Sequence, residues 1–215
     1  MKLDIKICGL STPETIDAAL RCGASHVGFI FFDKSPRNID PARAGELRAA
    51  ARGKAGAVAV TVDADDRRLD HIVETMAPDM LQLHGRESPQ RVAELKARYG
   101  LSVIKALPIS TRQDLGAASD YSGIADRLMF DAKPPPGASL PGGNATRFDW
   151  SILQALPPET DYLLAGGIDP QNVGEAIAIA HPPGLDVSSG VECAPGVKDI
   201  GLIEALFAAI RKARA

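Results

Sequence analysis

Several polar side chains in this sequence lie at or just after short apolar segments, at spacings that put them on one face of a strand. In the segment 3–7, alternate residues are apolar, and Lys6 shares the opposite parity with Cys8. The same arrangement recurs further along the chain at Gln82, His84, Asp131, Asp186 and Ser188. Alternate residues of a strand point to opposite faces, so we expect these side chains to point toward one region. A thiol, carboxylates, an ammonium group and an imidazole in one place can carry out general acid–base chemistry.

Each of these residues also has a purely structural interpretation. Taken alone, Cys8 fits a buried packing thiol. Lys6, Lys105 and Asp186 fit an internal layer of ion pairs, and His84 fits a cap for the following helix. The functional interpretation depends on all of them lying at the same end of the predicted strands.

Two turns late in the chain are rich in small residues. Gly166 and Gly167 follow one apolar segment, and Ser188, Ser189 and Gly190 follow the next. Small residues let backbone N–H groups approach an anion, and the hydroxyls add donors. The pair of turns predicts a phosphate-binding site. The sequence lacks the glycine patterns of P-loop and dinucleotide-binding proteins.

The elements that must position these residues follow a regular rhythm, in which short apolar segments alternate with longer Ala-rich amphipathic ones. Eight strands are predicted, at 3–7, 26–31, 57–62, 80–83, 102–107, 127–130, 162–165 and 185–187. This alternation is typical of a parallel sheet. Eight units in 215 residues average about 27 residues each, near the lower limit for a (β/α)₈ barrel. We predict an α/β fold, a single-domain TIM barrel of near-minimal size over residues 1–215, with its active site at the carboxyl ends of the strands.

Helix starts are predicted where capping residues precede the amphipathic segments. These starts are at 11–14, 40–41, 63–66, 88–89, 110–111, 149 and 169–170. Residues 132–147 break the rhythm because they are too rich in Pro and Gly for a helix and too long for an ordinary turn. A purely structural interpretation of this segment is an ordinary surface loop. Since the segment follows the sixth strand at the end where barrel enzymes keep functional loops, we predict a lid over the active site.

Composition excludes several classes of partner. With 24 Lys and Arg against 27 Asp and Glu, the net charge of −3 provides no basic surface for nucleic acid or an anionic membrane. The N-terminal segment carries charges and lacks the apolar core of a signal peptide, and no apolar run approaches a membrane span. The three cysteines form no metal-ligand pattern and indicate a reducing cytoplasm. Cys22, in a predicted helix, and Cys193, in a predicted turn, are interpreted as structural. We expect a monomer, with a homodimer as the alternative.

The chain closely resembles the phosphoribosylanthranilate isomerase family of tryptophan biosynthesis. The motifs that carry the resemblance are Lys-Ile-Cys-Gly at 6–9, Gly-Phe-Ile-Phe at 28–31, Ser-Pro-Arg at 35–37, Leu-Gln-Leu-His-Gly at 81–85, Phe-Asp at 130–131, Phe-Asp-Trp at 148–150, Leu-Ala-Gly-Gly at 164–167 and Asp-Val-Ser-Ser-Gly-Val-Glu at 186–192. They occur in order along essentially the whole chain.

The resemblance implies an Amadori rearrangement of a phosphosugar–anthranilate substrate, N-(5-phosphoribosyl)anthranilate, without metal or cofactor. It also implies that Cys8 is the general base, Asp131 the general acid and Arg37 the ligand of the anthranilate carboxylate. The two Gly- and Ser-rich turns, 166–167 and 188–190, would hold the phosphate. Lys6, His84 and Asp186 complete the predicted substrate site.

One departure and two alternatives remain. The loop before Phe148 commonly ends in Gly in this family, but here Ala145 takes that position. If the position requires a positive φ, Ala145 costs roughly 1 kcal/mol and alters closure of the loop. An aminoaldose isomerase of histidine biosynthesis would perform the same rearrangement, but that family typically has Asp where this chain has Cys8. A barrel that binds a phosphate ligand without catalysis is the other alternative.

Overall fold

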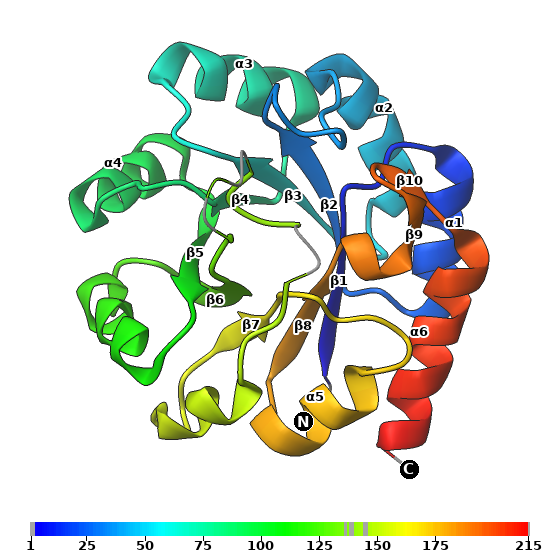
Figure 1. Cartoon of the computed structure of the whole chain (residues 1–215). Helices are drawn as coiled ribbons and strands as arrows, with labels where there is room; N and C mark the ends of the chain where they lie inside the picture. The colour runs from blue at the N-terminus through cyan, green and yellow to red at the C-terminus, as the bar shows by residue number, and fades with distance from the viewer. Residues whose placement is uncertain (1–2, 136, 138–139, 144–145, 215) are drawn as a thin grey trace.

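Eight parallel strands close into a barrel in the computed structural model, which describes residues 3–135, 137, 140–143 and 146–214 (Figure 1). The strands are β1 (Asp4–Cys8), β2 (His26–Phe31), β3 (Gly56–Thr61), β4 (Met80–Leu83), β5 (Ser102–Ile109), β6 (Arg127–Ala132), β7 (Tyr162–Leu164) and β8 (Gly184–Val187). Each pairs with the next, and β8 pairs with β1 to close the barrel. The predicted TIM barrel is confirmed, and each predicted strand is found with ends shifted by at most two residues.

Helices surround the barrel on its outer side (Figure 1). They are α1 (Pro13–Cys22), α2 (Pro41–Ala51), α3 (Asp66–Met76), α4 (Pro89–Tyr99), the 3₁₀ helices η1 (Arg112–Tyr121) and η2 (Trp150–Ala155), then α5 (Val173–Ala180) and α6 (Ile200–Ala213). A third 3₁₀ helix, η3 (Ser189–Val191), follows β8 at the carboxyl end of the barrel. Side-chain oxygens of the predicted caps Thr12, Asp40, Asp65 and Ser88 accept backbone N–H bonds at the starts of α1 to α4. Pro at the first helical position follows the cap in α1, α2 and α4.

Three later connections differ from the predicted α-helices. The units after β5 and β6 contain the 3₁₀ helices η1 and η2. The seventh helix begins at Val173, after the cap Asn172, and not at 169–170. The Asp169 carboxylate accepts the N–H groups of Gln171 and Asn172, so it closes a turn that delays the helix.

A short antiparallel hairpin that was not predicted follows η3. Its strands are β9 (Glu192–Ala194) and β10 (Val197–Lys198). Cys193 lies in β9 with its side chain exposed, so the predicted position in a turn was wrong. The hairpin packs against the loop after β2, where a Cβ on Gly196 would lie 2.5 Å from the carbonyl oxygen of Pro36.

The strands separate an apolar core inside the barrel from the apolar clusters between the strands and the helices. Inside the barrel, the buried residues are Cys8, Val58, Val60, Ile104, Ala106, Met129, Leu163 and Ala165. A larger core lies between the strands and the helices. Lys105 alternates with two of the interior residues, so it points outward, where its Nζ pairs with Glu87 at 2.7 Å. The interpretation of Lys105 as part of an internal ion-pair layer was therefore wrong, whereas Lys6 and Asp186 do pair inside the barrel.

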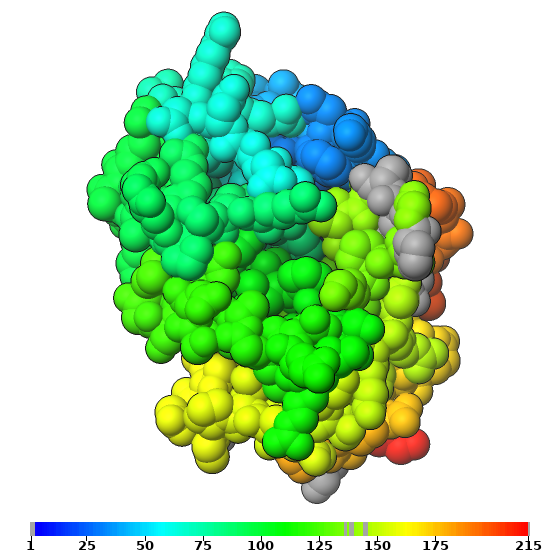
Figure 2. Space-filling view, turned by 60° about the vertical axis from the view of Figure 1, so that its left-hand side comes forward, coloured from blue at the N-terminus to red at the C-terminus, as the bar shows by residue number. Residues whose placement is uncertain are grey.

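Successive units also lie in order on the molecular surface. Figure 2 shows α3, α4 and η1 following one another along one side, with the segment around η2 below them. Among the described residues, no helix combines the length and apolar character needed to span a membrane.

Candidate active site

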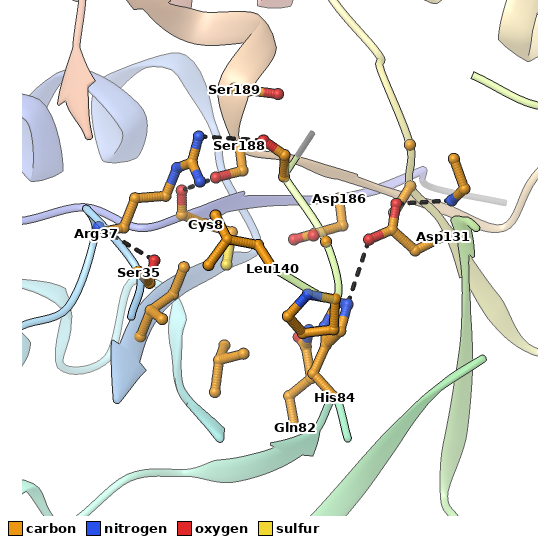
Figure 3. Close-up of a pocket in the computed structure, with 18 of the residues that line it drawn as sticks. Cys8, Ser35, Arg37, Gln82, His84, Asp131, Leu140, Asp186, Ser188 and Ser189 are labelled. Carbon is orange, nitrogen blue, oxygen red and sulfur yellow. Dashed lines mark hydrogen bonds and ion pairs between the residues drawn. The ribbon is translucent and has the colours of Figure 1, made fainter. Parts of the chain in front are cut away.

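A cavity opens at the carboxyl ends of the strands, with about 790 Å³ of empty space including its mouth. Its walls come from all parts of the chain. Among the residues that line it are Cys8, Arg37, Gln82, His84, Asp131, Gly142, Gly143, Gly166, Gly167, Asp186, Ser188 and Ser189 (Figure 3). Residues distant in sequence meet here because the parallel strands end on the same side of the barrel.

Two of the predicted site residues do not line this cavity. Lys6 is fully buried beneath it, where its Nζ donates to Oδ1 of Asp186 at 2.7 Å. Gly190 serves a packing role, since a Cβ at this position would lie 1.9 Å from the carbonyl oxygen of Ile168. Only glycine lets the turn after β8 approach the turn after β7 this closely.

Cys8 lies 4% exposed at the end of β1, beside the Lys6–Asp186 pair. Burial raises the pKa of the Cys8 thiol, and the negative charge of Asp186 adds to this effect, while Lys6 opposes it without cancelling it. Burial lowers the pKa of Lys6, but Asp186 and Cys8 outweigh it, so the pKa of Lys6 lies above its usual value. In the free protein we therefore expect a protonated Lys6 next to a Cys8 that is mainly thiol. The expected help from Lys6 is present but is smaller than the cost of burying a thiolate.

Gly28 on β2 leaves the room that Cys8 requires. A Cβ at this position would lie 2.9 Å from Sγ of Cys8 and 3.0 Å from Nζ of Lys6. Position 28 was part of a recognised motif but had no assigned role. The register of β1 and β2, which pairs Cys8 with Gly28, supplies the reason for its small size.

Asp131 ends β6 and faces His84, with Oδ2 3.3 Å from Nε2 (Figure 3). Its other oxygen, Oδ1, accepts the backbone N–H of Ala132 at 2.8 Å. Nε2 of Gln82 lies 2.9 Å from Nδ1 of His84. With the amide donating to Nδ1, the imidazole hydrogen lies on Nε2 and points toward Asp131. The suggested role of His84 as a helix cap was wrong, because Ser88 caps α4.

Arg37, in the loop after β2, is held by a residue of the β9–β10 hairpin. Its Nε and Nη2 donate to the two carboxylate oxygens of Glu192 at 2.7 and 2.8 Å. Nζ of Lys198 donates to the same carboxylate at 2.5 Å and to the carbonyl of Ser188 at 2.9 Å. Neither Glu192 nor Lys198 was among the predicted site residues. The one signal was that Glu192 ends the last recognised motif.

The two predicted phosphate turns lie side by side at the cavity. Gly166 and Gly167 have positive φ angles of 89° and 63°, a conformation that favours glycine. A Cβ on Gly166 would also lie 2.7 Å from the backbone nitrogen of Ala132. Ser188 and Ser189 line the cavity from the β8 side. Backbone and hydroxyl donors of this kind suit an oxyanion ligand.

The predicted lid, 132–147, contributes to the cavity through the part that the structure describes. Gly142 and Gly143 line it, and a Cβ on Gly142 would lie 2.5 Å from Oδ2 of Asp131. Ala145 and residues 136, 138, 139 and 144 lie outside the described residues, so the prediction about Ala145 stays a prediction. Within the described part of the chain, no cluster of His, Cys, Asp and Glu could hold a metal ion.

Comparison with known proteins gives consistent matches over the whole chain. A family model described as N-(5′-phosphoribosyl)anthranilate (PRA) isomerase matches residues 5–209. The N-(5′-phosphoribosyl)anthranilate isomerase of Mesorhizobium japonicum is 64% identical over 214 residues, covering 100% of this chain and 98% of the relative. The enzyme of the same name from Brucella canis is 60% identical over 215 residues, covering 100% and 97%.

Solved structures agree with these relatives. The crystal structure of phosphoribosyl anthranilate isomerase from Thermotoga maritima superimposes with a TM-score of 0.87 at 30% identity, covering 98% of this chain and 100% of that one. A second structure of this kind of enzyme, in complex with reduced 1-(o-carboxyphenylamino)-1-deoxyribulose 5-phosphate, gives a TM-score of 0.85 at 28% identity with the same coverage. With the cavity at the expected end of the barrel, these matches establish that the chain belongs to the N-(5′-phosphoribosyl)anthranilate isomerase family.

Proposed function

We propose that this chain converts N-(5-phosphoribosyl)anthranilate to 1-(2-carboxyphenylamino)-1-deoxyribulose 5-phosphate in tryptophan biosynthesis. One observation carries the assignment of roles: Cys8 and Asp131 come from strands on different sides of the barrel and line one cavity. A base and an acid on different walls suit a reaction that removes a proton at one atom of a ligand and adds one at another. Arg37 and the two phosphate turns line the same cavity, which suits a ligand with a carboxylate and a phosphate.

The proton transfers balance as follows. Protonated Asp131 gives its proton to the ring oxygen of the ribose, the bond from this oxygen to C1′ breaks, and an iminium forms with the anthranilate nitrogen. The Cys8 thiolate then removes the proton from C2′, and the resulting enolamine tautomerises to the ketone. Cys8 ends protonated and Asp131 ends charged, so exchange with solvent restores both. The sequence moves only protons and electron pairs within the substrate, so its chemistry requires no cofactor.

The starting protonation states are unusual, because ordinary pKa values of about 8.5 for Cys and 3.9 for Asp favour the opposite pair at neutral pH. The raised pKa of Cys8 makes the thiolate a minor species in the free protein. Lys6 lies next to Cys8 and stabilises that minor species electrostatically. We therefore assign Lys6 a positioning role through Cys8 and Asp186. His84 and Asp186 line the cavity and contact the substrate in this proposal.

Three substitutions test these roles in an assay with freshly generated phosphoribosylanthranilate. Cys8→Ala and Asp131→Asn should each lower kcat by orders of magnitude, since each removes a proton-transfer group. Arg37→Ala should mainly raise KM, because the carboxylate is remote from the reacting carbons. Cys22→Ser, in helix α1, is the matched control and should leave kcat unchanged. Near-normal turnover by either of the first two variants in folded protein would remove that residue from the mechanism.

Two further expectations accompany this function. The three cysteines are free, which fits the reducing cytoplasm expected from the sequence. We also propose that the protein is a monomer, because the large hydrophobic side chains exposed on its described surface are Val197 and Ile200 alone. Complementation of a tryptophan auxotroph provides a test of the function in cells.

A further inference from the structure

The β9–β10 hairpin places two charged residues behind Arg37, and all three side chains are buried. The exposed fractions are 5% for Arg37, 4% for Glu192 and 1% for Lys198. A buried charge is costly unless it is paired, so a three-membered network in the wall of a cavity requires an explanation.

The hydrogen bonds divide the guanidinium into two edges. Glu192 takes the edge formed by Nε and Nη2, at 2.7 and 2.8 Å. Its carboxylate is itself fixed by Lys198 at Oε1 and by the backbone N–H of Gly196 at Oε2, 3.2 Å away. Nη1 is on the other side and faces Gly143, where a Cβ would approach it to 2.7 Å. Nη2 also donates a long hydrogen bond of 3.5 Å to the carbonyl oxygen of Gly143. Because position 143 is glycine and lines the cavity, a ligand carboxylate that replaces this long contact can reach the second edge of the guanidinium.

The charges of the network leave a surplus. Arg37 and protonated Lys198 contribute two positive charges and Glu192 one negative charge, so the buried group then carries a net charge of +1. Burial lowers the pKa of Lys198, and Glu192 opposes this effect without cancelling it. Burial would raise the pKa of Glu192, but Arg37 and Lys198 outweigh it and hold this pKa below its usual value. Glu192 therefore remains a carboxylate at neutral pH. A ligand carboxylate on the second edge of Arg37 would neutralise the group.

We propose that Glu192 is a positioning residue that orients Arg37 for the carboxylate of the substrate, with Lys198 preserving the surplus positive charge. The identity of that carboxylate rests on the proposed function. A bidentate pair fixes the plane of a guanidinium, and only a fixed plane can offer two parallel N–H groups to a second carboxylate. Glu192 thereby sets the preference for substrates whose aromatic ring carries a carboxylate.

If only net charge mattered, replacing Glu192 would change the affinity for a carboxylated ligand in the opposite direction. If Glu192 only competed with the substrate for Arg37, removing its charge would strengthen binding of an anion. If Glu192 positions Arg37, replacing it weakens binding even though the positive charge of the wall increases. Glu192→Gln removes the charge at nearly constant shape, while Glu192→Asp keeps the charge and withdraws it by one methylene group. Positioning predicts that both variants bind the carboxylated ligand more weakly.

The experiment compares two ligands by calorimetry on the full chain. One is reduced 1-(o-carboxyphenylamino)-1-deoxyribulose 5-phosphate, and the other is the same compound without the carboxyl group. Each Glu192 variant should lose about tenfold in affinity for the first ligand, as expected for one lost charge-assisted hydrogen bond, and less than twofold for the second. In an Arg37→Ala background, Glu192→Gln should have no further effect on the ratio of the two affinities. Glu204→Gln, with Glu204 half exposed on helix α6, is the control and should change neither affinity.

Several outcomes would overturn the proposal. Tighter binding of the carboxylated ligand by Glu192→Gln would show competition, and equal losses for both ligands would show a general structural role. If Glu192→Gln does not fold, Glu192→Asp keeps a negative charge near both cations while withdrawing it from Arg37, and carries the same test. Absence of turnover by the wild type would contradict the proposed function separately, because the ligand comparison does not depend on turnover.

Discussion

Cys8 occupies a position in which its surroundings both oppose and support a thiolate. Burial and Asp186 disfavour the charge, and Lys6 favours it. The thiolate form of Cys8 is therefore a minor species, but it is strongly basic once formed. Since the register of β1 and β8 pairs Lys6 with Asp186, the balance is set by three side chains on two neighbouring strands.

Substitutions of the two charged neighbours should shift the pKa of Cys8 in opposite directions. Lys6→Met removes the positive charge that stabilises the thiolate, so the pKa of Cys8 should rise further. Asp186→Asn removes the negative charge that destabilises the thiolate, so this pKa should fall. Ultraviolet absorbance of the thiolate is followed against pH in a Cys22→Ser/Cys193→Ser background. Subtraction of the same titration of Cys8→Ala in that background removes the contribution of the three tyrosines and gives the pKa of Cys8.

The pH profile of kcat/KM should follow the same shifts. Activity requires thiolate Cys8 together with protonated Asp131, so it declines once the pH exceeds the higher of the two pKa values. Because burial raises the pKa of Cys8, the alkaline decline should begin above the ordinary thiol value of about 8.5. Asp186→Asn should move the alkaline decline of kcat/KM to lower pH. If Lys6→Met and Asp186→Asn moved the alkaline decline of kcat/KM in the same direction, the electrostatic account would be wrong.

Among the elements, β5 supports the active site from outside the barrel. Nζ of Lys105 donates to the carbonyls of Leu83 at 3.3 Å and Gly85 at 2.7 Å, on either side of His84. It also pairs with Glu87, which accepts the N–H of Gly85. The ion pair therefore fixes the backbone from which His84 reaches Asp131.

Removing one partner of the Lys105–Glu87 pair should lower the free energy of unfolding more than replacing both partners. Lys105→Met leaves the buried Glu87 carboxylate without its cation, so the free energy of unfolding should fall by roughly 3–5 kcal/mol. In Lys105→Met/Glu87→Gln no uncompensated charge remains, and the loss should be smaller than in the single variant. Urea denaturation of both variants measures the difference. A double variant at least as unstable as Lys105→Met would show that Glu87 stabilises the fold independently of Lys105.

Which residues of a strand point into the barrel could be predicted only where polar and apolar residues alternate. In β1 the alternation placed Lys6 and Cys8 on the inner face correctly. Around Lys105 the sequence is apolar on both sides, so it contains no parity signal, and the residue was assigned to the wrong face. Whether Lys105 points into or out of the barrel therefore depends on tertiary partners such as Glu87.

Long-range pairs and short irregular elements could not be predicted from local patterns. Arg37 and Glu192 are 155 residues apart, and only closure of the barrel brings them together. The β9 and β10 strands have three and two residues, too few for a period to be recognised. The same limit applies to η2, whose six residues were expected to form an α-helix.

At the scale of the whole molecule, the distribution of charge matters more than its sum. The net charge is −3, yet the substrate carries a phosphate and a carboxylate. Buried cations at the cavity are paired, as Lys6 is with Asp186 and Arg37 is with Glu192. The proposed phosphate site therefore depends on backbone and hydroxyl donors of two turns, and the carboxylate site depends on the surplus charge contributed by Lys198.

The surface of the described residues predicts a single chain in solution. Its exposed large hydrophobic residues are Val197 at 52% and Ile200 at 38%, both close to the β10 end of the hairpin. A stable dimer buries about 800 Å² per partner around an apolar centre, which two side chains do not supply. Light scattering during gel filtration should give a mass near 22.6 kDa over a wide range of concentration. A mass near twice this value that returns to one chain in Val197→Asp would instead identify the hairpin as a dimer interface.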